Sequence, residues 1–202
     1  MRRFLGGTEK IRKEIIMTTI KSFREIYGKN LSLITLSKEY LDDMWEYSKE
    51  PKLYEFFEYK PFTDKKELNK YFLKIEEKSK KINCNYWFVQ ENISKKVIGS
   101  MNAYSLDPVR NSCMIGFAIS PHFWGQGVID EILELIIKEL FHYYNMNRIS
   151  AVTYSSNTRC IKKLLKFNFQ IEGNLKEYYK DYNGIRHDAT LLALTKKSIN
   201  EI

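Results

Sequence analysis

The sequence predicts one domain of the α/β (α+β) class, and three observations favour it. Strand-like and helix-like segments follow one another in the order β-α-α-β-β-β-α-β-α-β-β. The chain has 202 residues, of which 44% are hydrophobic, enough for one ordinary core. It contains no internal repeat, linker or low-complexity block. Residues 27–202 are therefore expected to form a single domain, with residues 1–26 as an N-terminal tail or extra helix.

The first part of this pattern is one strand and two helices. Residues 31–35 alternate as in a strand, and Ser37 is a candidate N-cap for a helix that ends before Pro51. Residues 52–63 are rich in aromatic side chains. Asp64 then follows as a candidate cap for the second helix.

Three strands and the strongest helix come next. The strands are expected at residues 85–91, 96–105 and 113–120, separated by turn residues. From Ile129 to Tyr144, apolar residues recur at three- and four-residue steps, which predicts an amphipathic helix.

The last part of the pattern ends in a hairpin. A short strand is expected at residues 148–154 and a helix at residues 157–167, closed by Asn168 in a left-handed conformation. The hairpin covers residues 169–195, with Asn183–Gly184 at its turn.

Composition disfavours several other classes of protein. The apolar run Leu191–Leu194 falls far short of the roughly 18 residues of a membrane span, so no membrane association is expected. Three cysteines and three histidines lack ligand spacing, so neither a metal site nor a disulfide framework is expected, and the cytoplasm is the expected compartment. The net charge of +8 is interpreted as a mixed, solvated surface, and nucleic-acid binding is not favoured.

The segment Trp124–Ile129 lies between a predicted strand and the long helix. Gly125 and Gly127 let the backbone turn tightly and approach a ligand closely. A helix start offers unpaired N–H groups and a positive dipole end, which suits a pyrophosphate. Taken alone, the pattern is equally compatible with a plain strand-to-helix turn.

Further motifs lie before and after this segment in a fixed order and spacing. They are Ile115–Ile119 leading into Pro121–Gly127, then Asn147–Ile149, Asn157, Lys166–Phe169, Glu172–Gly173, Tyr178–Tyr179, Asn183–Gly184 and Asp188. Through this set the chain resembles the GNAT acyltransferase superfamily, and the resemblance covers about Leu31–Thr195. Within it, the chain resembles the branch of ribosomal-protein N-terminal acetyltransferases (RimJ/RimL type).

The resemblance implies the GNAT fold and its cofactor. The fold is a mixed, mostly antiparallel central sheet of about seven strands, flanked by helices and splayed between the fourth and fifth strands. The cofactor is acetyl-CoA, with its pantetheine arm along Ile115–Ile119 and its pyrophosphate at Trp124–Val128. The candidate cofactor-binding residues are Phe117, Ala118, Ile119, Trp124, Gly125, Gln126, Gly127, Val128 and Asn157.

The resemblance also implies the reaction. A primary amine, from a peptide N-terminus or a small molecule such as an amino sugar, attacks the thioester directly, and N–H groups of Phe117–Ile119 stabilise the oxyanion. Phe57, Tyr104 and Tyr178 are the candidate acceptor-binding residues, and a core or shielding role is the alternative for the rings of the aromatic loop and the hairpin. The lack of a carboxylate cluster disfavours a polyamine acceptor, and a homodimer is left open.

Two departures concern the phosphate end. Ile129 stands where the family has a small residue, so it would either crowd the phosphates or face the core. Asp130 stands where a hydroxyl often meets a phosphate, and a carboxylate there would repel the pyrophosphate.

Two further departures concern proton transfer. Met114 replaces a glutamate base, so the base is expected elsewhere. A water held by Tyr104, Ser105 or His187 is one candidate, and a structural role is the alternative for each of these residues. Cys160 replaces a serine that protonates the departing thiolate. Cys160 is therefore the candidate catalytic residue, with a small buried residue as the alternative. A degenerate, non-catalytic domain that binds a ligand or partner is the alternative function.

Overall fold

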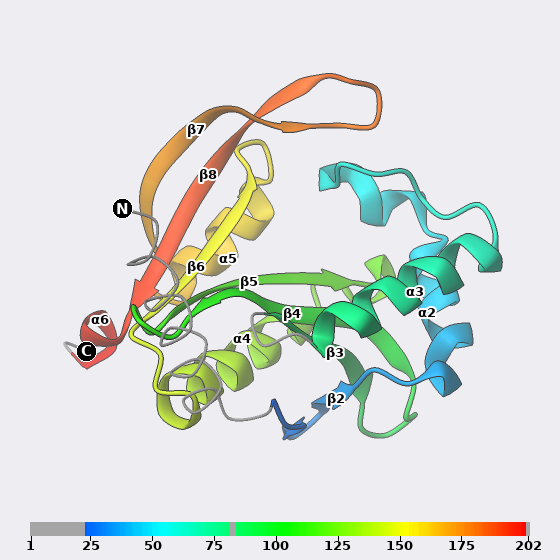
Figure 1. Ribbon diagram of the computed structural model, residues 1–202, viewed down its shortest axis with the longest axis horizontal. Helices are drawn as coiled ribbons and strands as arrows, with labels where there is room; N and C mark the ends of the chain where they lie inside the picture. Colours follow the sequence, from blue (N-terminus) through cyan, green and yellow to red (C-terminus); the bar gives the residue numbers. More distant parts are fainter. Residues whose placement is uncertain (1–22, 81–83, 201–202) are drawn as a thin grey trace, which may run out of the picture.

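The computed structural model describes residues 23–80 and 84–200, which form one eight-stranded sheet flanked by helices (Figure 1). The strand order is β1-β2-β3-β4-β5-β6-β8-β7, and all pairs are antiparallel except β5 with β6. The strands are β1 (Ile26–Tyr27), β2 (Leu31–Thr35), β3 (Cys84–Glu91), β4 (Val97–Asp107), β5 (Ser112–Ile119), β6 (Arg148–Tyr154), β7 (Gln170–Lys180) and β8 (Arg186–Thr195). The predicted mixed, mostly antiparallel sheet is confirmed, with the two-residue β1 as an additional strand.

The helices follow the predicted order. They are α2 (Leu41–Ser48), α3 (Lys65–Ser79), α4 (Val128–Lys138), α5 (Thr158–Lys166) and α6 (Lys196–Asn200). Three short 3₁₀ segments are η1 (Lys38–Tyr40), η2 (Pro51–Phe56) and η3 (Pro121–Phe123). The long helix predicted up to Tyr144 changes to a π-helical turn, η4 (Glu139–Tyr143), after α4.

Local signals mark two of the three predicted helix ends as expected. Asp64 Oδ1 accepts from the backbone N of Lys66 and Glu67, at 2.7 and 2.9 Å. Ser37 caps the 3₁₀ segment η1 rather than α2. Asn168 has φ 63°, which confirms the left-handed residue expected after α5.

The sheet separates two hydrophobic cores because neighbouring residues of a strand point to opposite faces. Trp87 on β3 packs in the core that includes Leu133 of α4, whereas Phe88 packs in the core that includes Phe72 of α3. All four side chains are fully buried. Helices thus cover both faces and hold the strands in place around the site.

The sheet opens between β5 and β6, the predicted fourth and fifth strands. Ser112–Met114 pairs with Arg148–Ser150 in parallel, and no later residues of the two strands pair. Beyond this point β6, β8 and β7 rise away from β5 (Figure 1). The predicted splay is therefore confirmed.

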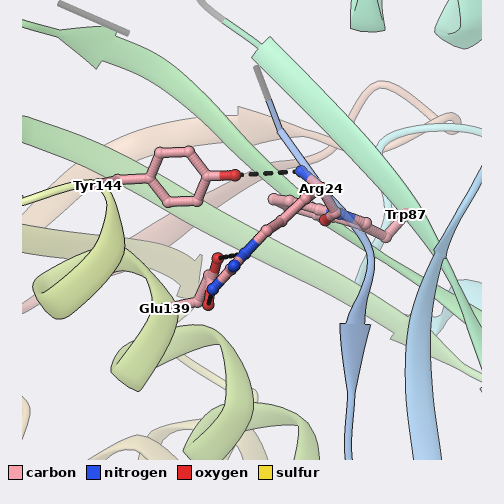
Figure 2. A network of polar contacts seen from close by, with 4 residues as sticks. All are labelled: Arg24, Trp87, Glu139 and Tyr144. Atoms are coloured by element: carbon pink, nitrogen blue, oxygen red, sulfur yellow. Dashed lines mark hydrogen bonds and ion pairs between the residues drawn. The ribbon is translucent and has the colours of Figure 1, made fainter. Parts of the chain in front are cut away.

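The N-terminal part of the described chain is held by a small polar network (Figure 2). Arg24 Nε donates to Glu139 Oε1 at 2.6 Å, and its backbone N donates to Tyr144 Oη at 3.1 Å. Trp87 Nε1 donates to the Arg24 carbonyl at 2.9 Å. Residues 23–26, the end of the predicted tail, thus lie against the domain, and residues 1–22 lie outside the described residues. Within the described residues, no helix has the length and apolar character of a membrane span.

Candidate active site

A continuous cleft of about 1120 Å³ occupies the splay. Its walls come from α2, η2 and the following loop, α3, β3 to β7, the first turn of α4, and α5. The cleft therefore joins the predicted cofactor segment to the aromatic segment that precedes α3.

The open edge of β5 presents backbone groups to the cleft. Ser120 N donates to Ile98 O on β4 at 2.8 Å. Because backbone direction alternates along a strand, the N–H of Ala118 also faces β4, whereas those of Phe117 and Ile119 face the splay. Of the three residues expected to offer N–H groups, two have the required direction.

The turn after β5 is built for close approach to a ligand. Gly125 and Gly127 have φ values of 79° and 80°, in the left-handed region that favours glycine. A Cβ atom added at either glycine would meet no atom within 4 Å, so the backbone faces open space. Gly127 is the N-cap of α4 and supplies no side-chain cap. Uncapped N–H groups in an open cradle fit the pyrophosphate of acetyl-CoA.

Trp124, in this turn, contacts residues on both sides of the splay. Its Nε1 donates to the Ile119 carbonyl at 2.8 Å, and the Arg159 guanidinium lies 3.8 Å from the centroid of its ring. Such a cation–π contact contributes about 0.5–1 kcal/mol at an exposed site. Gln126 is exposed, donates to the His122 carbonyl at 2.7 Å and does not line the cleft.

The site expected for the pyrophosphate carries less negative charge than Asp130 alone suggests. Lys163 Nζ lies 2.8 Å from both carboxylate oxygens of Asp130, and Lys166 Nζ lies 3.2 Å from one of them. These hydrogen bonds and charges hold the pKa of Asp130 below its usual value. The three groups together carry a positive charge, which offsets the expected repulsion. Ile129 packs against the core while lining the cleft, which favours the core interpretation.

Asn157 and Cys160 lie on the opposite wall. Asn157 Oδ1 accepts from Cys160 N at 3.2 Å, and its Nδ2 donates to Thr153 Oγ1 at 3.1 Å, so its side chain caps α5. Burial raises the pKa of the Cys160 thiol to about 11, against the opposing effects of Thr153 and the Arg159 charge. Cys160 therefore stays protonated at neutral pH, more firmly than a thiol with the ordinary pKa.

The acceptor side differs from expectation at one residue. Phe57 and Tyr104 line the cleft, but Tyr178 is 54% exposed and does not. Its neighbour Tyr179 lines the cleft instead, stacked on Tyr154 at a ring-centroid distance of 4.5 Å. A bulge between Leu175 and Tyr179, with Glu177 at φ 50°, interrupts the alternation of β7, so strand periodicity does not predict which tyrosine faces the cleft.

Of the residues considered for holding a basic water, Tyr104 alone lines this cleft. Ser105 is exposed, and His187 bonds to Asp181 at 3.1 Å in a separate, smaller pocket. Burial raises the pKa of Tyr104, so it is neutral at physiological pH. No group of three or more His, Cys, Asp or Glu side chains within the described residues is arranged to hold a metal ion.

Comparison with known proteins agrees with this geometry. The acetyltransferase (GNAT) domain family model matches residues 30–170, more than half of the chain. An uncharacterized N-acetyltransferase p20 of Bacillus licheniformis is 27% identical over 172 residues, covering 85% of this chain and 96% of that protein.

Solved structures give the same fold. A GCN5-related N-acetyltransferase from Brucella melitensis superposes with a TM-score of 0.80 at 17% identity, covering 89% of this chain and 81% of that one. A spermidine N-acetyltransferase from Vibrio cholerae, in complex with CoA and spermine, superposes with a TM-score of 0.72 at 17% identity, covering 85% and 98%. At this identity the likeness concerns the fold.

Proposed function

The chain belongs to the GNAT family of N-acetyltransferases, which use acetyl-CoA, and from this premise we propose that it acetylates a primary amine by direct attack. The acceptor we propose is a peptide N-terminus or a small amine such as an amino sugar, as in the RimJ/RimL-type branch. One observation carries the proposal. The glycine cradle before α4 and the unpaired edge of β5 open into the same cleft as the aromatic acceptor wall.

The residues of the cleft have distinct parts in this reaction. Acetyl-CoA supplies the activated acetyl group as a thioester. The N–H of Phe117 faces the splay and can donate to the carbonyl oxygen as negative charge develops there. Gly125, Gly127 and the start of α4 hold the phosphates through backbone N–H groups.

Cys160 is proposed to assist the departing sulfur as a hydrogen-bond donor. A new bond forms between the amine nitrogen and the acetyl carbon, the carbon–sulfur bond breaks, the amine loses a proton and the thiolate gains one. Because burial raises the pKa of Cys160 to about 11, full proton transfer to a thiolate of ordinary basicity is uphill. A neutral thiol can still stabilise the developing charge by donating a hydrogen bond.

The proton of the amine is proposed to leave through water held by Tyr104. Met114, at the family's base position, pairs with Tyr104 in the sheet and cannot accept a proton. Tyr104 is neutral at physiological pH and can orient a water without acting as a strong base. The reaction rate should therefore rise with pH until the acceptor amine itself is deprotonated.

The cytoplasm remains the proposed compartment. Cys84, Cys113 and Cys160 are all free thiols, which suits a reducing environment.

The proposal is tested by mixing the full chain with acetyl-CoA and separate peptide, amino-sugar and polyamine acceptors. Acetylated product is detected by mass spectrometry, so that the protein's own thiols do not interfere. Saturable acetylation of at least one primary amine is expected. Tight acetyl-CoA binding without turnover of any amine would instead favour the alternative of a non-catalytic binding domain.

A further inference from the structure

We propose that the acceptor amine also carries a negatively charged group, a phosphate or a carboxylate, which Lys74 and Lys78 of α3 bind at the acceptor end of the cleft. The inference rests on the proposed function, because it names the substrate class of the same site.

One stripe of α3 faces the cleft. Glu67, Tyr71, Lys74 and Lys78 all line it, at the four-, three- and four-residue steps of a single helix face. The buried Leu68 and Phe72 of α3 do not line the cleft and pack in the core instead. Lys74 and Lys78 are one turn apart and exposed, and neither has an ion-pair partner among residues 23–80 and 84–198. Two like charges on adjacent turns form a site for an anion.

The carboxylates of the wall are already bonded to the protein. Asp130 is paired with lysines, as described above. Glu67 Oε2 accepts from the backbone N and the hydroxyl of Thr63, at 3.2 and 3.1 Å. Glu58 Oε1 accepts from Lys180 N at 3.4 Å. Glu58 and Glu67 keep their negative charges, because their donors are neutral. Lys52, Lys60, Lys74 and Lys78 line the cleft from the same segments, η2 with the following loop and α3, so the net charge on the acceptor side is positive.

The sheet register gives the approximate separation between the positive charge of Lys78 and β5, the strand expected to hold the pantetheine arm. Lys78 is close enough to Cys84 at the start of β3 to oppose the rise that burial causes in its pKa. Cys84 pairs with Tyr104 on β4, which pairs with Met114 on β5. Two strand spacings amount to about 10 Å. An anionic group several bonds away from the amine would span this distance.

The space between the lysines and β5 is neutral and polar. Tyr71, Tyr86 and Asn102 line it, and burial raises the pKa of both tyrosines, so their hydroxyl groups stay protonated. Tyr59 packs against Tyr71 at a ring-centroid distance of 6.1 Å. Aromatic faces with hydroxyl donors suit a sugar ring or a peptide backbone. A polyamine would instead bring positive charge to the two lysines.

The test compares acceptors that differ only in charge, with the full chain and saturating CoA for binding or acetyl-CoA for turnover. Glucosamine 6-phosphate is compared with glucosamine for the phosphate arm. A short peptide with acidic residues after its N-terminus is compared with its amide counterpart for the carboxylate arm. At low salt, the anionic member of at least one pair should bind and turn over about tenfold better, which corresponds to about 1.4 kcal/mol. The preference should shrink with added salt.

Variants of α3 then test whether Lys74 and Lys78 cause this preference for anionic acceptors. Replacing both Lys74 and Lys78 by Gln should remove the preference, and replacing both by Glu should reverse it. The matched control replaces Lys66 and Lys70 by Gln, which makes the same charge change on the same helix outside the cleft. All of these side chains are exposed, so thermal denaturation should show that each variant folds.

The outcomes separate this inference from the proposed function. If neutral amines are acetylated as well as their anionic counterparts, or no anionic amine binds more tightly than its neutral counterpart, the inference is wrong while the acetyltransferase assignment stands. A preference that survives the Lys74 and Lys78 changes equally overturns it. Failure to bind acetyl-CoA at all would count against the proposed function itself.

Discussion

Replacing Gly127 by Ala separates the conformational role of this glycine from its role in the cofactor site. At φ 80°, an alanine is strained by about 1–2 kcal/mol, partly offset by the lower entropy of the unfolded chain. We expect a loss in the free energy of unfolding of about 1 kcal/mol, or about 2–4 °C in Tm for a chain of this size. The added Cβ meets no protein atom, so it projects into the space assigned to the pyrophosphate.

The affinity for acetyl-CoA should fall much further than this strain explains. A methyl group between the backbone N–H groups and the phosphates should weaken binding at least tenfold, or about 1.4 kcal/mol. Isothermal titration calorimetry measures this affinity, and thermal denaturation measures the strain.

Replacing Gly184 by Ala is the matched control. Gly184 has φ 88° in the β7–β8 turn, and an added Cβ there would make only an ordinary contact with Lys180, 3.7 Å away. The control should lose similar stability and keep the affinity for acetyl-CoA. Unchanged affinity in the Gly127 variant, or equal losses in both variants, would refute the assignment of this loop.

Four further predictions concern three side chains. Trp87→Phe should lower the free energy of unfolding by about 1–3 kcal/mol, because it opens space in the core and leaves the Arg24 carbonyl without its donor, and an unchanged Tm would contradict this. Asp130→Asn should tighten acetyl-CoA binding a few-fold at low salt by releasing the charge of Lys163, and weaker binding in calorimetry would contradict it. The same variant should lose a small stabilisation above about pH 4, because a carboxyl with a depressed pKa stabilises the fold only while it is ionised, and this difference should vanish as the pH falls below 3.8. Cys160, with a pKa of about 11, should react with iodoacetamide at pH 8 roughly a hundred times more slowly than an ordinary thiol, and labelling at the ordinary rate, followed by mass spectrometry, would refute its burial.

Local periodicity predicts most of the fold because each element has a pattern of its own. The cap at Asp64 and the left-handed Asn168 are read directly from residue type. The π-helical turn at Glu139–Tyr143 cannot be predicted from local patterns, because apolar spacing does not distinguish it from α-helix. Its buried Glu139 pairs with Arg24, 115 residues earlier in the chain, and this contact is invisible to local patterns.

Some features of the candidate site can be predicted from residue type, whereas others depend on contacts between distant parts of the chain. Gly125 and Gly127 are predictable because their backbone conformation favours glycine. The neutralisation of Asp130 depends on a lysine of another helix, 33 residues away, so the residue alone suggested repulsion. The prediction of Tyr178 is wrong, and Tyr179 lines the cleft, because residue type alone does not show which of two adjacent tyrosines faces it.

A crystal structure of the full chain with acetyl-CoA tests the central claim most directly. The phosphates should lie within hydrogen-bond distance of N–H groups between Gly125 and Val128, with the pantetheine arm along β5 at Phe117 and the thioester beside Cys160. Acetyl-CoA bound elsewhere, or phosphates held by side chains away from this turn, would contradict the account.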